Sequence, residues 1–255
     1  MAILQIQSLN LQIGSKTLCN DLTVQIGKHE RWGLLGKNGA GKTTLLHALI
    51  GQRRANQGSI QLDGVSVYDL KQRELASKVG ILFQHGIEAL PATVFETVML
   101  GRHPHTQSLL WDDQNDIEIA ESALTAFDLD RLKNRAVDTL SGGELQRLAL
   151  AMLLAQTPQL FLLDEPSNHL DVAFQVKLLT VLTNKVAETS ASMIMATHDI
   201  NLAFRFCENI ILLLKDGESL VGKSVDVLTE ENLTQAYGCH IKSVSSGEHR
   251  IFYPA

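Results

Sequence analysis

Cysteine is scarce in this chain, and no cysteine lies near another. Three occur among 255 residues, at positions 19, 207 and 239, without any C-x-x-C pair. An odd and dispersed set provides neither a disulfide framework nor a zinc knuckle. We therefore expect Cys19, Cys207 and Cys239 to be buried small apolar residues.

Long apolar runs and an excess of one charge are also absent. The longest nearly uninterrupted apolar stretches, such as 148–155 and 210–214, are much shorter than the roughly 18 to 20 residues that span a bilayer. The 22 basic and 28 acidic side chains give a formal net charge of −6, which predicts no nucleic-acid partner. The N-terminal residues lack the features of a secretory signal, so we expect a cytoplasmic location.

The apolar pattern predicts an α/β protein with one domain over residues 1–255. Alternation between 4 and 26 predicts half-buried strands in an N-terminal β layer. Later apolar segments alternate with helical patterns, which predicts βαβ crossovers and a parallel core. The strands are expected at 160–163, 192–196 and 210–214, and the helices at 172–187 and 200–206.

The middle of the chain has a different pattern. Strand signals nearly vanish between 85 and 140, while 93–100 and 113–127 have helical spacing. This part of the sequence therefore predicts a helical insert in the α/β core.

A glycine-rich segment, Gly36–Thr43, fits the pattern G-x-x-x-x-G-K-[ST]. Its glycines allow successive backbone N–H groups to point at phosphate oxygens, at the positive end of the following helix. Lys42 can then reach the β- and γ-phosphates, and the Thr43 hydroxyl can ligate Mg²⁺. The alternative is a chance glycine-rich turn, which the apolar strand before the segment and the helical pattern after it disfavour.

Two adjacent carboxylates, Asp164 and Glu165, end an apolar strand pattern. Ligands bind outside the carboxyl ends of parallel strands, so Asp164 is placed to hold magnesium. Glu165 is placed to act as general base or to orient the attacking water. The alternative is a pair of acidic residues that simply caps the next helix.

A second phosphate-binding device is predicted at Leu140–Arg147, which reads LSGGELQR. Ser141 with Gly142 and Gly143 would offer a hydroxyl and free N–H groups at the start of a helix over 144–155. The alternative is an ordinary helix capped by Ser141, although a cap does not need a pair of glycines.

With these motifs in this order, the chain resembles the nucleotide-binding subunit of ATP-binding-cassette (ABC) transporters over essentially its whole length. The resemblance implies a P-loop ATPase core with an N-terminal antiparallel β layer and an α-helical subdomain inserted at roughly 85–157. It also implies ATP and Mg²⁺ as cofactors. It further implies a homodimer in which the LSGGELQR segment of one subunit closes on the ATP held by the other.

The resemblance also suggests roles for single residues. Gln84 is similar to the glutamine that touches Mg²⁺ and the attacking water and senses the membrane partner. Asp171, in the loop 168–171, is similar to a residue that crosses the dimer interface, and His198 is similar to a switch histidine at the γ-phosphate. Alone, these residues would be interpreted as a surface glutamine, a helix cap and a histidine at a strand end.

The complete set of expected site residues has three parts. The nucleotide is expected at Gly36, Asn38, Gly39, Gly41, Lys42, Thr43, Thr44, Ser141, Gly142, Gly143 and Asp171. Magnesium is expected at Thr43, Gln84 and Asp164, and the chemistry at Glu165, His198 and Gln84. One position departs from the family, because Ile13 stands where an aromatic side chain commonly stacks on adenine.

Three stretches, at 98–105, 165–172 and 227–238, are similar to the corresponding stretches in the ATPase subunits of a group of importers. This group takes up iron–siderophore complexes, haem, vitamin B12 and sometimes oxyanions such as molybdate. This likeness implies two membrane-spanning permease subunits, an extracytoplasmic binding protein and a peripheral location at the cytoplasmic face of the plasma membrane. The alternatives are a soluble ABC ATPase that acts on ribosomes, DNA or iron–sulfur assembly, and the ATPase of an exporter. A plain interpretation of Arg102, His103 and His105 is a solvated turn.

Overall fold

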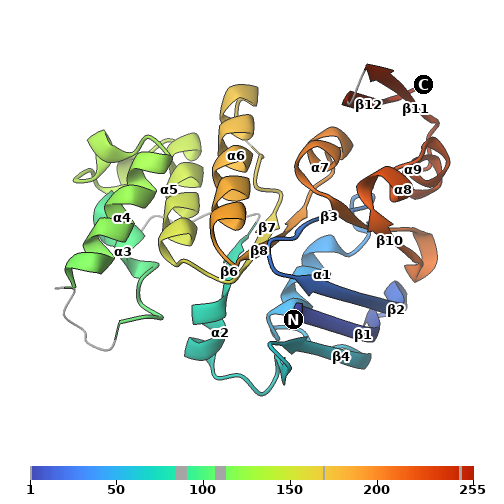
Figure 1. The fold of residues 1–255 in the computed structure, drawn as a ribbon, viewed down its shortest axis with the longest axis horizontal. Helices are drawn as coiled ribbons and strands as arrows, with labels where there is room; N and C mark the ends of the chain where they lie inside the picture. Colours follow the sequence, from blue (N-terminus) through green and yellow to red (C-terminus); the bar gives the residue numbers. More distant parts are fainter. Residues whose placement is uncertain (1, 84–90, 107–112, 169, 247–248) are drawn as a thin grey trace.

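The computed structural model describes residues 2–83, 91–106, 113–168, 170–246 and 249–255. Its first layer is an antiparallel sheet with the order β2-β1-β4-β5, drawn in blue and teal in Figure 1. The strands are β1 (Ala2–Ile13), β2 (Lys16–Gly27), β4 (Gln57–Leu62) and β5 (Val65–Ser66). Leu4 lies opposite Ile26 and Ile6 opposite Val24, so the predicted alternation does place one face in the core.

The second layer is a sheet with the order β10-β9-β3-β8-β7-β6. Its strands are β3 (Arg31–Leu35), β6 (Val79–Leu82), β7 (Leu160–Asp164), β8 (Ser192–Ala196), β9 (Asn209–Leu213) and β10 (Ser219–Lys223). Strand β10 is antiparallel to β9, and the other neighbouring pairs are parallel. The predicted parallel core is therefore confirmed.

Helices cover both faces of the parallel sheet. Helix α1 (Lys42–Leu49) shares a core with the N-terminal sheet, and α6 (Val172–Glu188) and α7 (Ile200–Phe206) belong to the core on the other face. The short α2 (Gln72–Lys78) leads into β6. None of the helices in the described part of the chain is long and apolar enough to cross a bilayer.

A group of helices lies at one end of the molecule, green in Figure 1. It contains α3 (Val94–Leu100), α4 (Gln114–Ala126) and α5 (Gly142–Ala155), with 3₁₀ turns at Asp130–Leu132 and Val137–Thr139. Thr93, Asp113 and Ser141 cap the three helices through their side chains. Their inward faces bury residues such as Val98, Leu124 and Leu148.

The interpretation of Arg102 as part of a solvated turn is wrong. Arg102 is 5% exposed and Asp116, on α4, is 6% exposed. The Arg102 Nε donates to Asp116 Oδ1 at 2.7 Å, and its Nη1 donates to the Ala155 carbonyl at 2.7 Å and to Thr157 Oγ1 at 2.8 Å. Arg102 therefore joins the helices of this group from inside, because a buried guanidinium needs such partners.

The C-terminal part was not predicted as elements. It forms α8 (Ser224–Val227), α9 (Glu230–Tyr237) and the hairpin β11 (Ile241–Ser246) with β12 (His249–Pro254). We name residues 224–255 the C-terminal unit. Cys19 and Cys207 are buried as expected, but Cys239 is exposed, because it follows Gly238, the C-cap of α9, in the connection to β11.

Candidate active site

The glycine-rich segment forms the turn between β3 and α1. Gly39 has φ +75° and Gly41 has φ +109°, and a Cβ at Gly41 would approach Leu18 Cβ to 2.9 Å. Both positions therefore need glycine. Gly41 precedes α1 without a side-chain cap, so the first N–H groups of the helix are available to an anion.

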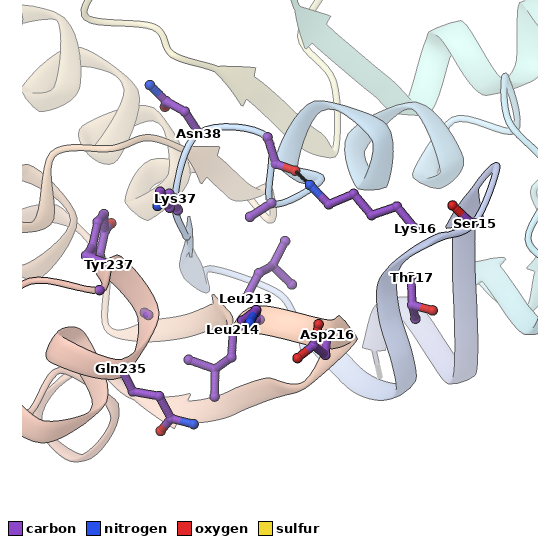
Figure 2. A pocket seen from close by; sticks show the side chains of 15 residues that line it. Ser15, Lys16, Thr17, Lys37, Asn38, Leu213, Leu214, Asp216, Gln235 and Tyr237 are labelled. Carbon is purple, nitrogen blue, oxygen red and sulfur yellow. Dashed lines mark hydrogen bonds between the residues drawn. The ribbon is translucent and has the colours of Figure 1, made fainter.

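Two lysines hold the loop in its shape. The Lys42 Nζ donates to the Gly36 carbonyl at 3.0 Å, which closes the loop on itself. Lys16 reaches across from β2 and donates through Nζ to the Gly39 carbonyl at 2.7 Å (Figure 2). Sequence reasoning did not identify Lys16, because its contact with the loop depends on how the two sheets are stacked.

A cavity of about 440 Å³ joins this loop to the carboxylates. Its lining includes six of the expected nucleotide residues, the two carboxylates and Ile13, together with Lys16 and Leu18, which the sequence did not single out. The residues are Ile13, Lys16, Leu18, Asn38, Gly39, Gly41, Lys42, Thr43, Thr44, Asp164 and Glu165. The fold therefore brings the P-loop and the paired carboxylates to one place.

Asp164 is a buried carboxylate that no described side chain or backbone group hydrogen-bonds. It is 2% exposed, and neither Oδ1 nor Oδ2 has a hydrogen-bond partner among the described residues. Such a group is costly unless a cation or donors satisfy it when the site is loaded. Carboxylate and hydroxyl oxygens are ligands that Mg²⁺ prefers, so Asp164 with the Thr43 hydroxyl fits this ion.

Glu165 is held by two groups. Its Oε2 lies 2.8 Å from His198 Nδ1, and its Oε1 lies 3.8 Å from Lys42 Nζ. The backbone at Glu165 has φ +51°, an uncommon conformation for this residue type. Burial lowers the pKa of Lys42, and the neighbouring carboxylates Glu165 and Asp164 act in the opposite direction.

The segment Ser141–Gly143 is not among the described residues that line this cavity. Ser141 is a helix cap, as the alternative interpretation held, and it forms a capping box with Glu144. The backbone and side-chain hydrogen bonds from Ser141 lower the pKa of Glu144. A Cβ at Gly142 or Gly143 would meet no atom within 4 Å, so packing inside this chain does not explain the two glycines.

The remaining expected residues are placed as follows. Asp171 caps α6, its Oδ1 accepting from the Phe174 N–H at 2.8 Å, and His198 lies beside Glu165 with a side chain that is 60% exposed. Gln84 lies outside the described residues. Gln146, on α5, donates to the Pro166 carbonyl at 3.2 Å, which ties the LSGGELQR helix to the residue after Glu165.

These features define a P-loop protein built to bind and hydrolyse a nucleoside triphosphate. The family model described as "ABC transporter" matches residues 19–168. The chain belongs to the ABC transporter family, and its activity is ATP hydrolysis. The expectations for family and fold are thereby confirmed.

Individual relatives match over nearly the whole chain. The ferric enterobactin transport ATP-binding protein FepC of Escherichia coli is 33% identical over 93% of this chain and 88% of its own length. The hemin import ATP-binding protein HmuV of Pseudomonas entomophila is 35% identical over 94% of each chain.

Two solved structures of ABC proteins are also similar to this chain. A metal-chelate type ABC transporter in an inward-facing conformation matches with a TM-score of 0.84 and 26% identity, over 100% of this chain and 98% of its own. An ATP-binding cassette in a dimeric post-hydrolysis state with ADP and phosphate matches with a TM-score of 0.75 and 28% identity, over 87% of this chain and 98% of its own.

Proposed function

We propose that this chain is the ATPase subunit of an importer for a metal chelate such as an iron–siderophore complex or haem, for vitamin B12, or for a related cargo. The observation that carries the proposal is the match over 100% of the chain to a metal-chelate type transporter. That match includes the C-terminal unit, which lies beyond the residues 19–168 of the general family model. The named relatives are transport proteins for ferric enterobactin and hemin.

The geometry supports specific roles in hydrolysis. The P-loop N–H groups, Lys42 and Thr44 would bind the phosphates, while Thr43 and Asp164 would hold Mg²⁺. Gln84, which lies outside the described residues, would join them by the resemblance to the family alone. When bound, Mg²⁺ neutralises charge on the phosphates. Glu165 accepts a proton from, or orients, the attacking water, and His198 contacts the γ-phosphate.

A second copy of the chain completes the site. The space beside Gly142 and Gly143 at the start of α5 is open, yet Ser141 and the two glycines are not among the described residues that line the nucleotide cavity of their own chain. A head-to-tail homodimer resolves this, because the LSGGELQR segment of each copy then reads the ATP of the other. The dimeric neighbour with ADP and phosphate supports this arrangement.

The side chain at position 13 should influence how tightly the cavity binds ATP. Ile13 is 44% exposed at the cavity wall, and an aliphatic side chain lacks the stacking energy of about 0.5 to 1.5 kcal/mol that an aromatic ring provides. We expect Ile13→Tyr to tighten ATP binding by roughly 2- to 12-fold, measured as the Kd of the purified chain. Ile13→Leu is the matched control, and an equal Kd for all three proteins would show that other residues hold the base.

The transport proposal predicts a membrane partner. The chain would lie at the cytoplasmic face of the plasma membrane below two permease subunits, and an extracytoplasmic protein would deliver the cargo. A helical subdomain at roughly 85–157 within one domain of 1–255 would pass motion at the nucleotide site to the permease.

Co-expression tests this partner directly. We expect the chain to remain in the soluble fraction when expressed alone and to sediment with membranes when the permease encoded beside it is co-expressed. If the chain stays in the soluble fraction beside every neighbouring permease tested, or sediments with ribosomes, the soluble ABC ATPase is favoured instead. The same assay with each candidate permease omitted is the control.

A further inference from the structure

Lys16 connects two parts of the nucleotide cavity that belong to different sheets. It is the first residue of β2, and its partner across the ladder, at the end of β1, is Ile13. Its Nζ donates to the Gly39 carbonyl of the P-loop at 2.7 Å, as the dashed line in Figure 2 shows. The side chain therefore extends from the expected base end of the cavity, at Ile13, to the phosphate loop.

The backbone that carries Lys16 is held by contacts outside the P-loop. Thr17 pairs with Gln12 across the β1–β2 ladder. A Cβ on Gly217, in the turn after β9, would come within 2.5 Å of Thr17 Cγ2. The start of β2 thus packs closely against this turn, which fixes the point from which the Lys16 side chain extends.

The ammonium of Lys16 has donors and charge available for a ligand. An ammonium has three N–H donors, and the Gly39 carbonyl accepts one hydrogen bond from it. Among the described residues, no carboxylate lies within ion-pair distance of Lys16, whereas Lys42 has Glu165 at 3.8 Å. Lys16 is also exposed, so its charge is available to an anion that enters the cavity.

The P-loop is open on the side that faces this ammonium. The atom that a Cβ on Gly39 would meet within 4 Å is Lys16 Nζ, at 3.8 Å. Lys16, Asn38 and Gly39 line both the nucleotide cavity of about 440 Å³ and a neighbouring cavity of about 630 Å³. A nucleotide that reaches from Ile13 to the loop must therefore pass beside Lys16.

We propose that Lys16 is a nucleotide-binding residue, whose ammonium contacts the phosphate chain of ATP on its base side while it keeps the hydrogen bond to Gly39. Lys42 reaches the β- and γ-phosphates from the loop, so the two lysines approach the phosphate chain from different elements. The contact of Lys16 needs phosphate but no base, and it adds affinity where Ile13 provides no stacking. The inference rests on the proposed nucleotide site.

Lys16→Met tests this inference in the purified full chain, because it removes the charge and keeps the aliphatic stem. Loss of a charge-assisted contact near the surface predicts a Kd for ATP that is about 5- to 10-fold higher in low salt. In about 0.5 M NaCl the difference should fall below about 2-fold, since salt screens an exposed charge pair. Inorganic triphosphate, measured by competition with ATP, should lose affinity by the same factor because it has phosphates and no base.

Two further variants make the result specific. Lys28→Met changes an exposed lysine just beyond the other end of β2, and this matched control should bind ATP as the parental chain does. Lys16→Gln retains a donor for the Gly39 carbonyl but carries no charge. It should bind ATP as weakly as Lys16→Met, because the charge is what the phosphate chain contacts.

Three results would overturn the inference: an unchanged Kd for Lys16→Met, parental affinity in Lys16→Gln, or a loss of the same size at both salt concentrations. The last would show that Lys16 acts only on the shape of the loop. Lys42→Ala, measured in parallel, tests the proposed site itself. If that variant binds ATP as tightly as the parental chain, the nucleotide site is wrong; if it loses binding while Lys16→Met does not, only the role of Lys16 is wrong.

Discussion

Glu165→Gln should abolish steady-state ATP hydrolysis while ATP still binds. Removal of a general base or a water-orienting carboxylate typically lowers the rate by about 10² to 10⁴. The phosphate cradle is unaffected, since it consists of backbone N–H groups and Lys42. In the parental chain His198 Nδ1 lies 2.8 Å from Glu165 Oε2. A glutamine side-chain oxygen at position 165 can still accept a hydrogen bond from His198, so the local fold should persist.

The same variant should accumulate an ATP-bound dimer. In the proposed head-to-tail arrangement, hydrolysis is the step that opens the dimer, and a chain that binds without hydrolysing remains closed. Size-exclusion chromatography with and without ATP measures this, and Glu188→Gln, at the exposed end of α6, is the matched control. Parental hydrolysis, or a monomer under every condition, would contradict the roles given to Glu165 and to the shared site.

Arg102→Ala should be strongly destabilising. The substitution leaves the Asp116 carboxylate, 6% exposed, without its cationic partner, and it removes the donor to the Ala155 carbonyl. Breaking a buried ion pair in this way costs about 3 to 5 kcal/mol of the free energy of unfolding. Urea unfolding followed by circular dichroism measures the loss.

Two further variants make this result specific. Lys133→Ala breaks an ion pair with Glu121 whose side chains are 45% and 49% exposed, and it should cost less than about 1 kcal/mol. Adding Asp116→Asn to Arg102→Ala should recover part of the loss, because no unpaired charge then remains buried. Equal losses for Arg102→Ala and Lys133→Ala would show that the buried pair does not support the helices around it.

Local motifs were predictable because their geometry depends on neighbours in the sequence. The P-loop needs glycines where φ is positive and a helix directly after them, and the segment from Gly36 to Thr43 contains both. The position of Asp164 at the end of β7 also follows from the apolar strand before it. Roles that depend on a second copy of the chain, such as that of Ser141, came from the resemblance to a family.

Contacts between distant segments were decided by the tertiary structure. Ser141 and Asp171 cap helices in this chain, which the sequence allowed but did not distinguish from an interface role. Arg102 looked like a surface residue because its partners on α4 and after α5 are brought to it only by helix packing.

The sequence by itself determined the α/β class, the positions of core strands along the chain, the phosphate-binding loop and the paired carboxylates. Each of these rests on apolar periodicity or on backbone needs within a few residues. Only the tertiary structure placed His198 against Glu165 and Arg102 against Asp116. The residues of each pair come from different elements or connections, and their meeting depends on the order of strands in the sheet and on how the helices around Arg102 pack.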